Sequence, residues 1–97
     1  MILFEAMENN TYIYDETWAA VIRQLLRTAK AESGMTYDQI SLALEERFGI
    51  HQTPANIKGK FNKVNFGAQL FTQLLIVMGK QQLDLDELYR RYLESKN

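Results

Sequence analysis

Two helix signals follow one another in the stretch that decides the fold, residues 36–65, which reads TYDQISLALEERFGIHQTPANIKGKFNKVN. Thr36 with Gln39 three residues later is a capping box, a pattern typical of a helix start. A glycine ends that helix. Thr53 followed by Pro54 starts the next one, because threonine caps well and proline suits the first helical position. The stretch therefore predicts two short helices joined by a turn.

Apolar residues in both helices recur every three or four positions, as they do on the buried face of an amphipathic helix. They are Tyr37, Ile40, Leu44 and Phe48 in the first helix, and Ile57, Phe61 and Val64 in the second. Three further helices are expected around this pair. One runs from about Asp15 to Glu32, one follows Gly67, and the last begins at Asp84. The fold class is therefore all-α, a bundle of about five helices that contains a helix-turn-helix.

The predicted core draws on every one of these helices. Its members are Trp18, Leu25, Ile40, Leu44, Ile57, Phe61, Phe66, Leu70, Leu74 and Leu88. The helix-turn-helix domain is expected to span residues 15–97. Residues 1–14, MILFEAMENNTYIY, form a separate N-terminal segment whose aromatic and β-branched content suits a short strand or hairpin, and an unstructured start is the alternative.

Composition excludes several classes of protein. The chain has 97 residues and no cysteine, which rules out disulfides, thiolate zinc sites and cysteine nucleophiles. No apolar run approaches the roughly 20 residues of a membrane span, and the N-terminus lacks the basic region of a signal peptide. We expect a cytoplasmic protein without membrane contact, and neither a metal site nor a cofactor.

Charge is unevenly distributed along the chain despite a net charge of −1. Residues 1–46 carry eight acidic and three basic side chains, whereas residues 47–83 carry five basic and no acidic ones. Such polarity allows an acidic protein to present a basic face.

The sequence contains no evident set of catalytic residues. The only histidine, His51, lies in the predicted turn with no acidic residue near it in the chain, so no base with an orienting partner is evident. Neighbouring carboxylates such as Glu45 and Glu46 do not face each other on a helix. We expect a protein that is not an enzyme.

The helix at about residues 53–64 has the features of a DNA-recognition helix. Its apolar side is opposed by a face that holds small residues, amides and lysines and no acid. Asparagine can pair with adenine edges in the major groove, and lysines can reach phosphates. The predicted DNA-binding residues are Gln52, Thr53, Asn56, Lys58, Gly59, Lys60, Asn62 and Lys63.

The function predicted from these features is double-stranded DNA binding by a transcriptional regulator. Specific readout requires a homodimer, because paired half-sites are read by two copies. Its interface is expected in residues 1–14 or in the final helix. The alternative is a protein-interaction or antitoxin-like module on the same fold, which the absence of arginine from the helix at 53–64 favours, since arginine to guanine is the commonest specific contact.

Residues 25–44, LLRTAKAESGMTYDQISLAL, resemble the opening of phage-repressor-like domains of the Cro and Xre type. That resemblance implies a bundle of about five helices whose third helix enters the major groove. A closer resemblance, from about Trp18 to Leu85, is to a bacterial family called domain of unknown function sixty-four seventy-one. The residues that carry it are Tyr37, Ile40, Asn56, Ile57, Lys60, Phe61, Lys63, Phe66, Leu70, Phe71, Gln73, Leu75 and Gly79.

The chain departs from this family at Lys63-Val64, where the family usually has Arg-Gly. Valine disfavours positive φ because it is β-branched. The helix is therefore expected to run on past this point or to leave it differently.

Overall fold

The computed structural model describes residues 14–96, and within that range every regular element is an α-helix. The five helices are α2 (Glu16–Ser33), α3 (Tyr37–Phe48), α4 (Pro54–Lys63), α5 (Ala68–Val77) and α6 (Leu85–Lys96). The predicted all-α class and the number of helices are confirmed. The strand or hairpin predicted for residues 1–14 lies outside the described residues, except for Tyr14, whose hydroxyl donates a hydrogen bond to Glu16 at 2.7 Å.

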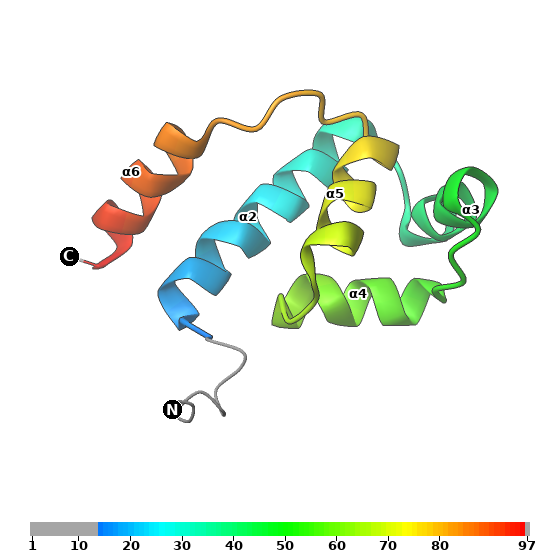
Figure 1. Cartoon of the computed structure of the whole chain (residues 1–97), viewed down its shortest axis with the longest axis horizontal. Helices are drawn as coiled ribbons and strands as arrows, with labels where there is room; N and C mark the ends of the chain where they lie inside the picture. The colour runs from blue at the N-terminus through cyan, green and yellow to red at the C-terminus, as the bar shows by residue number, and fades with distance from the viewer. Residues whose placement is uncertain (1–13, 97) are drawn as a thin grey trace, which may run out of the picture.

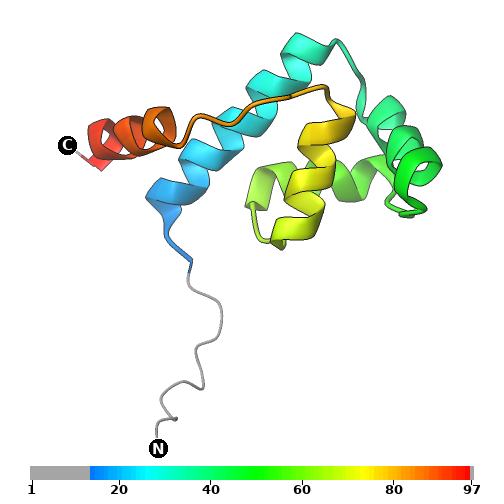
Figure 2. The same cartoon turned by 45° about the horizontal axis from the view of Figure 1, so that its top comes forward.

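The longest helix, α2, lies between two unequal groups of elements (Figure 1). It packs on α4 on one side and on α6 on the other, while α3 packs on both α4 and α5. The segment after α5 runs back along α2 and reaches α6 at the far side of the molecule, as Figures 1 and 2 both show. The helix pair α3–α4 and helix α6 are therefore at opposite ends of the domain.

The helix starts follow the capping signals of the sequence. The Asp15 side chain accepts a hydrogen bond from the Trp18 amide at 3.0 Å. Thr36 and Gln39 form the complete capping box, with hydrogen bonds of 2.9 and 3.1 Å between each side chain and the other residue's amide. These bonds satisfy amides that have no partner inside the helix.

The main core joins α2, α3, α4 and α5. Its fully buried side chains are Leu26, Ile40, Leu44, Ile57, Phe61 and Leu74. Of the ten predicted core residues, Leu25, Ile40, Leu44, Ile57, Phe61, Leu74 and Leu88 are buried. Trp18, Phe66 and Leu70 are half-buried instead, because they lie at the margins of the two clusters rather than between helices.

A second, smaller cluster holds α6 on α2. Val21, Leu25 and Leu88 are its buried members. The ring of Trp18 stacks on that of Tyr92, with centroids 4.3 Å apart and planes 10° from parallel. Since α6 is fixed by this small cluster, its attachment depends on a few side chains.

The end of α4 differs from the expectation based on the sequence. The helix stops at Lys63, and Val64 takes the left-handed conformation with φ 52° and ψ 48°, its amide bonded to the carbonyl of Lys60 at 2.8 Å. The prediction that valine would avoid positive φ, so that the helix would run on or leave differently, is wrong. Val64 lines a pocket together with Ile22 and Phe66 and is half-buried, so the surrounding fold as a whole must offset a local strain of about 1–2 kcal/mol.

Val64→Gly is expected to be more stable than Val64→Ala by about 1 kcal/mol in urea denaturation. Both variants lose the branched side chain, but only alanine keeps a Cβ that is crowded at positive φ. At an ordinary helical position the order is reversed, because glycine is the poorer helix former. An alanine variant as stable as the glycine variant would contradict the left-handed conformation of residue 64.

Candidate nucleic-acid interface

Helix α4 has one buried face and one face open to solvent. Ile57 and Phe61 are buried in the main core, and Phe61 meets the edge of the Tyr37 ring at a centroid distance of 5.5 Å. The exposed residues of the helix are Ala55, Asn56, Lys58, Asn62 and Lys63, with Gly59 and Lys60 half-buried. The amphipathic pattern thus places the predicted DNA-binding residues of α4 on or beside its open face.

A shallow hollow of about 260 Å³ lies along this face. It is lined by Ala55, Asn56, Gly59, Lys60, Lys63 and Asn65. Two lysines and two asparagines therefore surround two of the smallest residues. Such a surface lets another backbone or a base edge approach closely and offers both cationic and amide donors.

Gln52 and Thr53, the two predicted DNA-binding residues that precede α4, also form hydrogen bonds that stabilise the turn and the start of the helix. The Thr53 side chain caps α4 by accepting a hydrogen bond from the Asn56 amide at 3.1 Å. The carbonyl of Gln52 accepts a hydrogen bond from the Ser41 hydroxyl, which ties the turn to α3. The Oε1 atom of Gln52 is buried without a hydrogen-bond partner among the described residues. Thr53 is exposed and Gln52 half-buried, so only Thr53 is fully open to a ligand.

Arginines of α2 reach the carboxyl end of α4, which sequence reasoning did not foresee. Arg23 donates a hydrogen bond from Nε to the carbonyl oxygen of Asn62 at 2.7 Å, and Arg27 donates one from Nη2 to the side-chain oxygen of Asn62 at 2.6 Å. Cations are favoured at a helix carboxyl end, where the last carbonyls lack partners inside the helix. Asn62 thus links α4 to α2, and its oxygen is already engaged.

These arginines add to the basic character of the site. The guanidinium of Arg23 is also 3.6 Å from a carboxylate oxygen of Glu16, which offsets part of its charge. Arg27 is exposed and adjoins the end of the lysine-bearing helix. Because its partner is 35 residues away in the chain, no local pattern could have revealed the contact.

His51 has an acidic neighbour after all, which corrects the sequence interpretation. Its Nδ1 atom is 3.7 Å from an oxygen of Glu45, brought close by the turn after α3. Both side chains are exposed. A pair so open to water lacks the enclosed setting in which a general base works, and the distance is beyond hydrogen-bond range.

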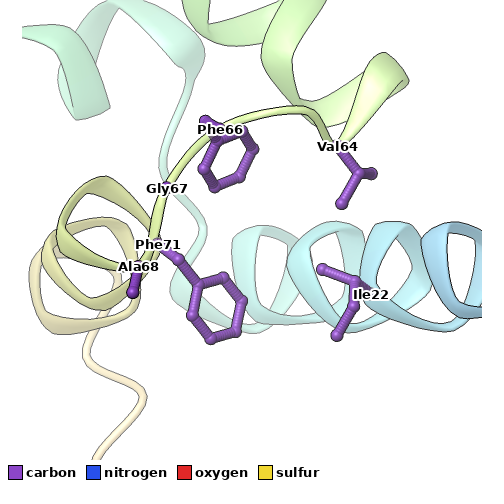
Figure 3. A pocket seen from close by; sticks show the side chains of 6 residues that line it. All are labelled: Ile22, Val64, Phe66, Gly67, Ala68 and Phe71. Atoms are coloured by element: carbon purple, nitrogen blue, oxygen red, sulfur yellow. The ribbon is translucent and has the colours of Figure 1, made fainter. Parts of the chain in front are cut away.

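An apolar pocket of about 270 Å³ lies next to the carboxyl end of α4 (Figure 3). Its walls are Ile22, Val64, Phe66, Gly67, Ala68 and Phe71. Val64 and Phe66 come from the segment between α4 and α5 and face Ile22 of α2, while Phe71 comes from α5. None of these six residues has a charged or hydrogen-bonding side chain, so no side chain of the lining would orient a polar ligand.

In residues 14–96, the features required for a membrane-spanning helix and for a metal site are also absent. No helix in this range is long and apolar enough to cross a membrane. No group of three or more histidine, cysteine, aspartate or glutamate side chains in the same range could hold a metal ion.

The fold and this surface define a small helical domain in which one helix presents an amide- and lysine-bearing face. The chain belongs to the family described as Domain of unknown function (DUF6471), whose model matches residues 18–83. The matched range begins within α2 and ends before α6, so it includes all of α3, α4 and α5. No curated protein and no solved structure matches this chain.

Proposed function

We propose that this protein binds double-stranded DNA through the open face of α4 and acts as a transcriptional regulator. In this proposal α3, the turn after it and α4 form a helix-turn-helix of the phage-repressor type. The observation that carries the proposal is the face of α4, on which lysines and asparagines surround Ala55 and Gly59 and no acidic side chain occurs. A major groove about 12 Å wide admits such a helix.

The placement of the lysines suits a groove with a phosphate backbone on each side. Lys58 and Lys63 are five residues apart, so they project from α4 about 140° from one another. Gly59 and Ala55 lie in the arc between them and permit close approach to base edges. Asn56 is the exposed amide best able to form the paired hydrogen bonds that adenine accepts and donates.

The anchoring of α4 also supports recognition. Its inner face is fixed by Ile57 and Phe61, its start by Thr53, and its end by the arginine contacts to Asn62. A surface held in place before binding loses little conformational entropy when a ligand arrives. The exposed lysine and asparagine side chains of the face would still need to become ordered.

Lys58→Ala combined with Lys63→Ala is expected to weaken binding to a labelled mixed-sequence duplex by about tenfold or more at low salt. The measurement is fluorescence anisotropy across a salt series. Removing two phosphate contacts should make the slope of log affinity against log salt shallower by about 2. The control is Lys80→Ala combined with Lys96→Ala, which removes the same charge outside α4. This control should bind almost as the unaltered protein does.

Two outcomes would count against the proposal. If the unaltered protein fails to bind duplex DNA even at low salt, the basic face of α4 has another role. If both double variants lose affinity equally, binding follows overall charge and does not involve α4 in particular.

A second candidate function is a protein-interaction or antitoxin-like module on the same fold. It is favoured by large apolar side chains exposed on α6, among them Leu85 and Tyr89. The same salt series separates the two candidates, because an interaction module without DNA binding would give no salt-dependent anisotropy change. If the protein does bind DNA, sequence-specific readout calls for a homodimer, since one recognition helix covers few base pairs.

A further inference from the structure

Helix α6 has one broad apolar face, with residues at i, i+3, i+4, i+7 and i+8, and α2 covers only part of it. The inner part of this face places Leu88 and Tyr92 against α2. The outer part bears Leu85, Tyr89 and Leu93, which are 68%, 55% and 43% exposed. These three residues, the α6 stripe, are spaced four apart and follow one ridge of the helix.

Tyr89, the middle residue of the α6 stripe, is held in place by aromatic side chains of the same domain. The ring of Tyr89 stacks against that of Tyr92 at a centroid distance of 6.5 Å, and Tyr92 stacks in turn on Trp18. A positioned aromatic ring loses little freedom on contact, which is a property of residues that anchor interfaces.

Charged side chains of α6 pair with one another away from the stripe. Arg90 contacts both Glu87 and Glu94, and Arg91 contacts Glu87 at 2.9 Å. These arginines lower the pKa of the Glu87 carboxyl, chiefly through the hydrogen bond from Arg90. Glu87 and Glu94 are thereby paired with arginines, so neither of these two carboxylates would be left unpaired when a second surface covers the stripe.

We propose that the α6 stripe is the contact between two copies of this protein, with the two α6 helices antiparallel. The stripe reads leucine, tyrosine, leucine and is symmetric about Tyr89. A two-fold axis at Tyr89 sets Leu85 against the partner's Leu93 and Leu93 against the partner's Leu85. A two-fold interface must be self-complementary in this way. The pairing supplies the second copy that the proposed function calls for, yet it depends on α6 alone.

The small size of this surface is typical of weak pairing. Covering the stripe and its rim would remove on the order of 500 Å² from each protomer, at the lower end for specific interfaces. Helix α6 lies on the far side of α2 from α4, so pairing through α6 leaves the face of α4 open (Figure 1). We therefore expect a weak, reversible dimer, which two half-sites on one duplex would strengthen by raising the local concentration.

The test is sedimentation equilibrium of the full chain without DNA, from about 20 µM to about 1 mM, the range in which small interfaces associate. The average mass is expected to rise toward that of a dimer. Leu85→Glu is expected to weaken association by about tenfold or more, because a carboxylate then meets the partner's Leu93. The control is Leu42→Glu, an equally drastic change at an exposed leucine of α3, which should leave association unchanged.

The double variant Leu85→Glu with Leu93→Lys tests the antiparallel register. The two substituted positions are eight residues apart on one helix, too far to pair within a protomer. Across the proposed two-fold axis each carboxylate meets the partner's ammonium, so the double variant should associate more tightly than the summed losses of Leu85→Glu and Leu93→Lys predict. A circular dichroism spectrum confirms that each variant remains helical.

Three results would overturn this proposal. A protein that stays monomeric over the whole concentration range has no such interface, whatever its affinity for DNA. Equal weakening by Leu42→Glu would show that association does not use the α6 stripe. Losses of Leu85→Glu and Leu93→Lys that simply add in the double variant would exclude the antiparallel register.

Discussion

Phe61→Ala is expected to lower the free energy of unfolding by about 3–5 kcal/mol, the usual range for a buried phenylalanine. The Phe61 side chain is fully buried at the point where α4 meets the rest of the core. Removal of the ring deletes its edge contact with Tyr37 and leaves a cavity among helices that are fixed by their other contacts. Since a small domain is stable by only about 5–15 kcal/mol, the variant should be close to unfolding.

Phe48→Ala is the matched control. The apolar spacing predicts that Phe48 lies on the buried face of α3, and that prediction is wrong, because Phe48 is the last residue of the helix and is 38% exposed. Its ring lies near the guanidinium of Arg47 at 5.8 Å, so a loss below about 1 kcal/mol is expected. Chemical denaturation followed by circular dichroism compares the two variants. Equal losses would mean that the buried and exposed faces of this helix pair have been wrongly assigned.

Leu88→Ala is expected to cost about 2–3 kcal/mol, toward the lower end of the range for buried leucines. Leu88 is the buried residue through which α6 joins Val21 and Leu25 of α2. The cluster is small and borders solvent, so part of the cavity can be filled by water or by movement of α6. Loss of this side chain should loosen α6 while α2, α3, α4 and α5 keep their common core.

Trp18 reports directly on this prediction, because it is the only tryptophan and it stacks on Tyr92 of α6. In Leu88→Ala its emission should shift to longer wavelength at denaturant concentrations where circular dichroism has barely changed. The control is Leu42→Ala, which removes an exposed leucine from α3. If Leu88→Ala loses no more stability than this control, α6 is not held by the cluster described above.

Our two proposals assign different surfaces of the domain to different partners. In these proposals α4 binds DNA and α6 binds a second copy of the protein, and α2 lies between these two helices and contacts both. A change that loosens α6, such as Leu88→Ala, should therefore disturb pairing more than the intrinsic affinity of one α4 face for DNA.

Much of the local structure follows from short-range signals. Thr36 with Gln39, and Thr53 with Pro54, predict helix starts because each side chain bonds to an amide only a few residues away. The apolar periodicity of α4 likewise predicts which side is buried, since a regular helix repeats its faces every 3.6 residues. These signals need no knowledge of the rest of the chain.

Three features of the candidate site escaped such reasoning. The Glu45 carboxylate near His51 depends on how the turn folds back. The arginine contacts to Asn62 join residues 35 and 39 positions apart. The left-handed Val64 contradicts the local preference of valine, since the connection from α4 to α5 fixes its backbone at positive φ.

The sequence by itself determined the helices, most of their caps, and the buried and acid-free faces of α4, because all of these arise from interactions within a few residues. The tertiary structure alone decided which surfaces those helices share. It set α6 apart from the main core, brought Arg23 and Arg27 to the end of α4, and left the α6 stripe exposed. Contacts between distant segments depend on the packing of whole helices, and no local pattern encodes them.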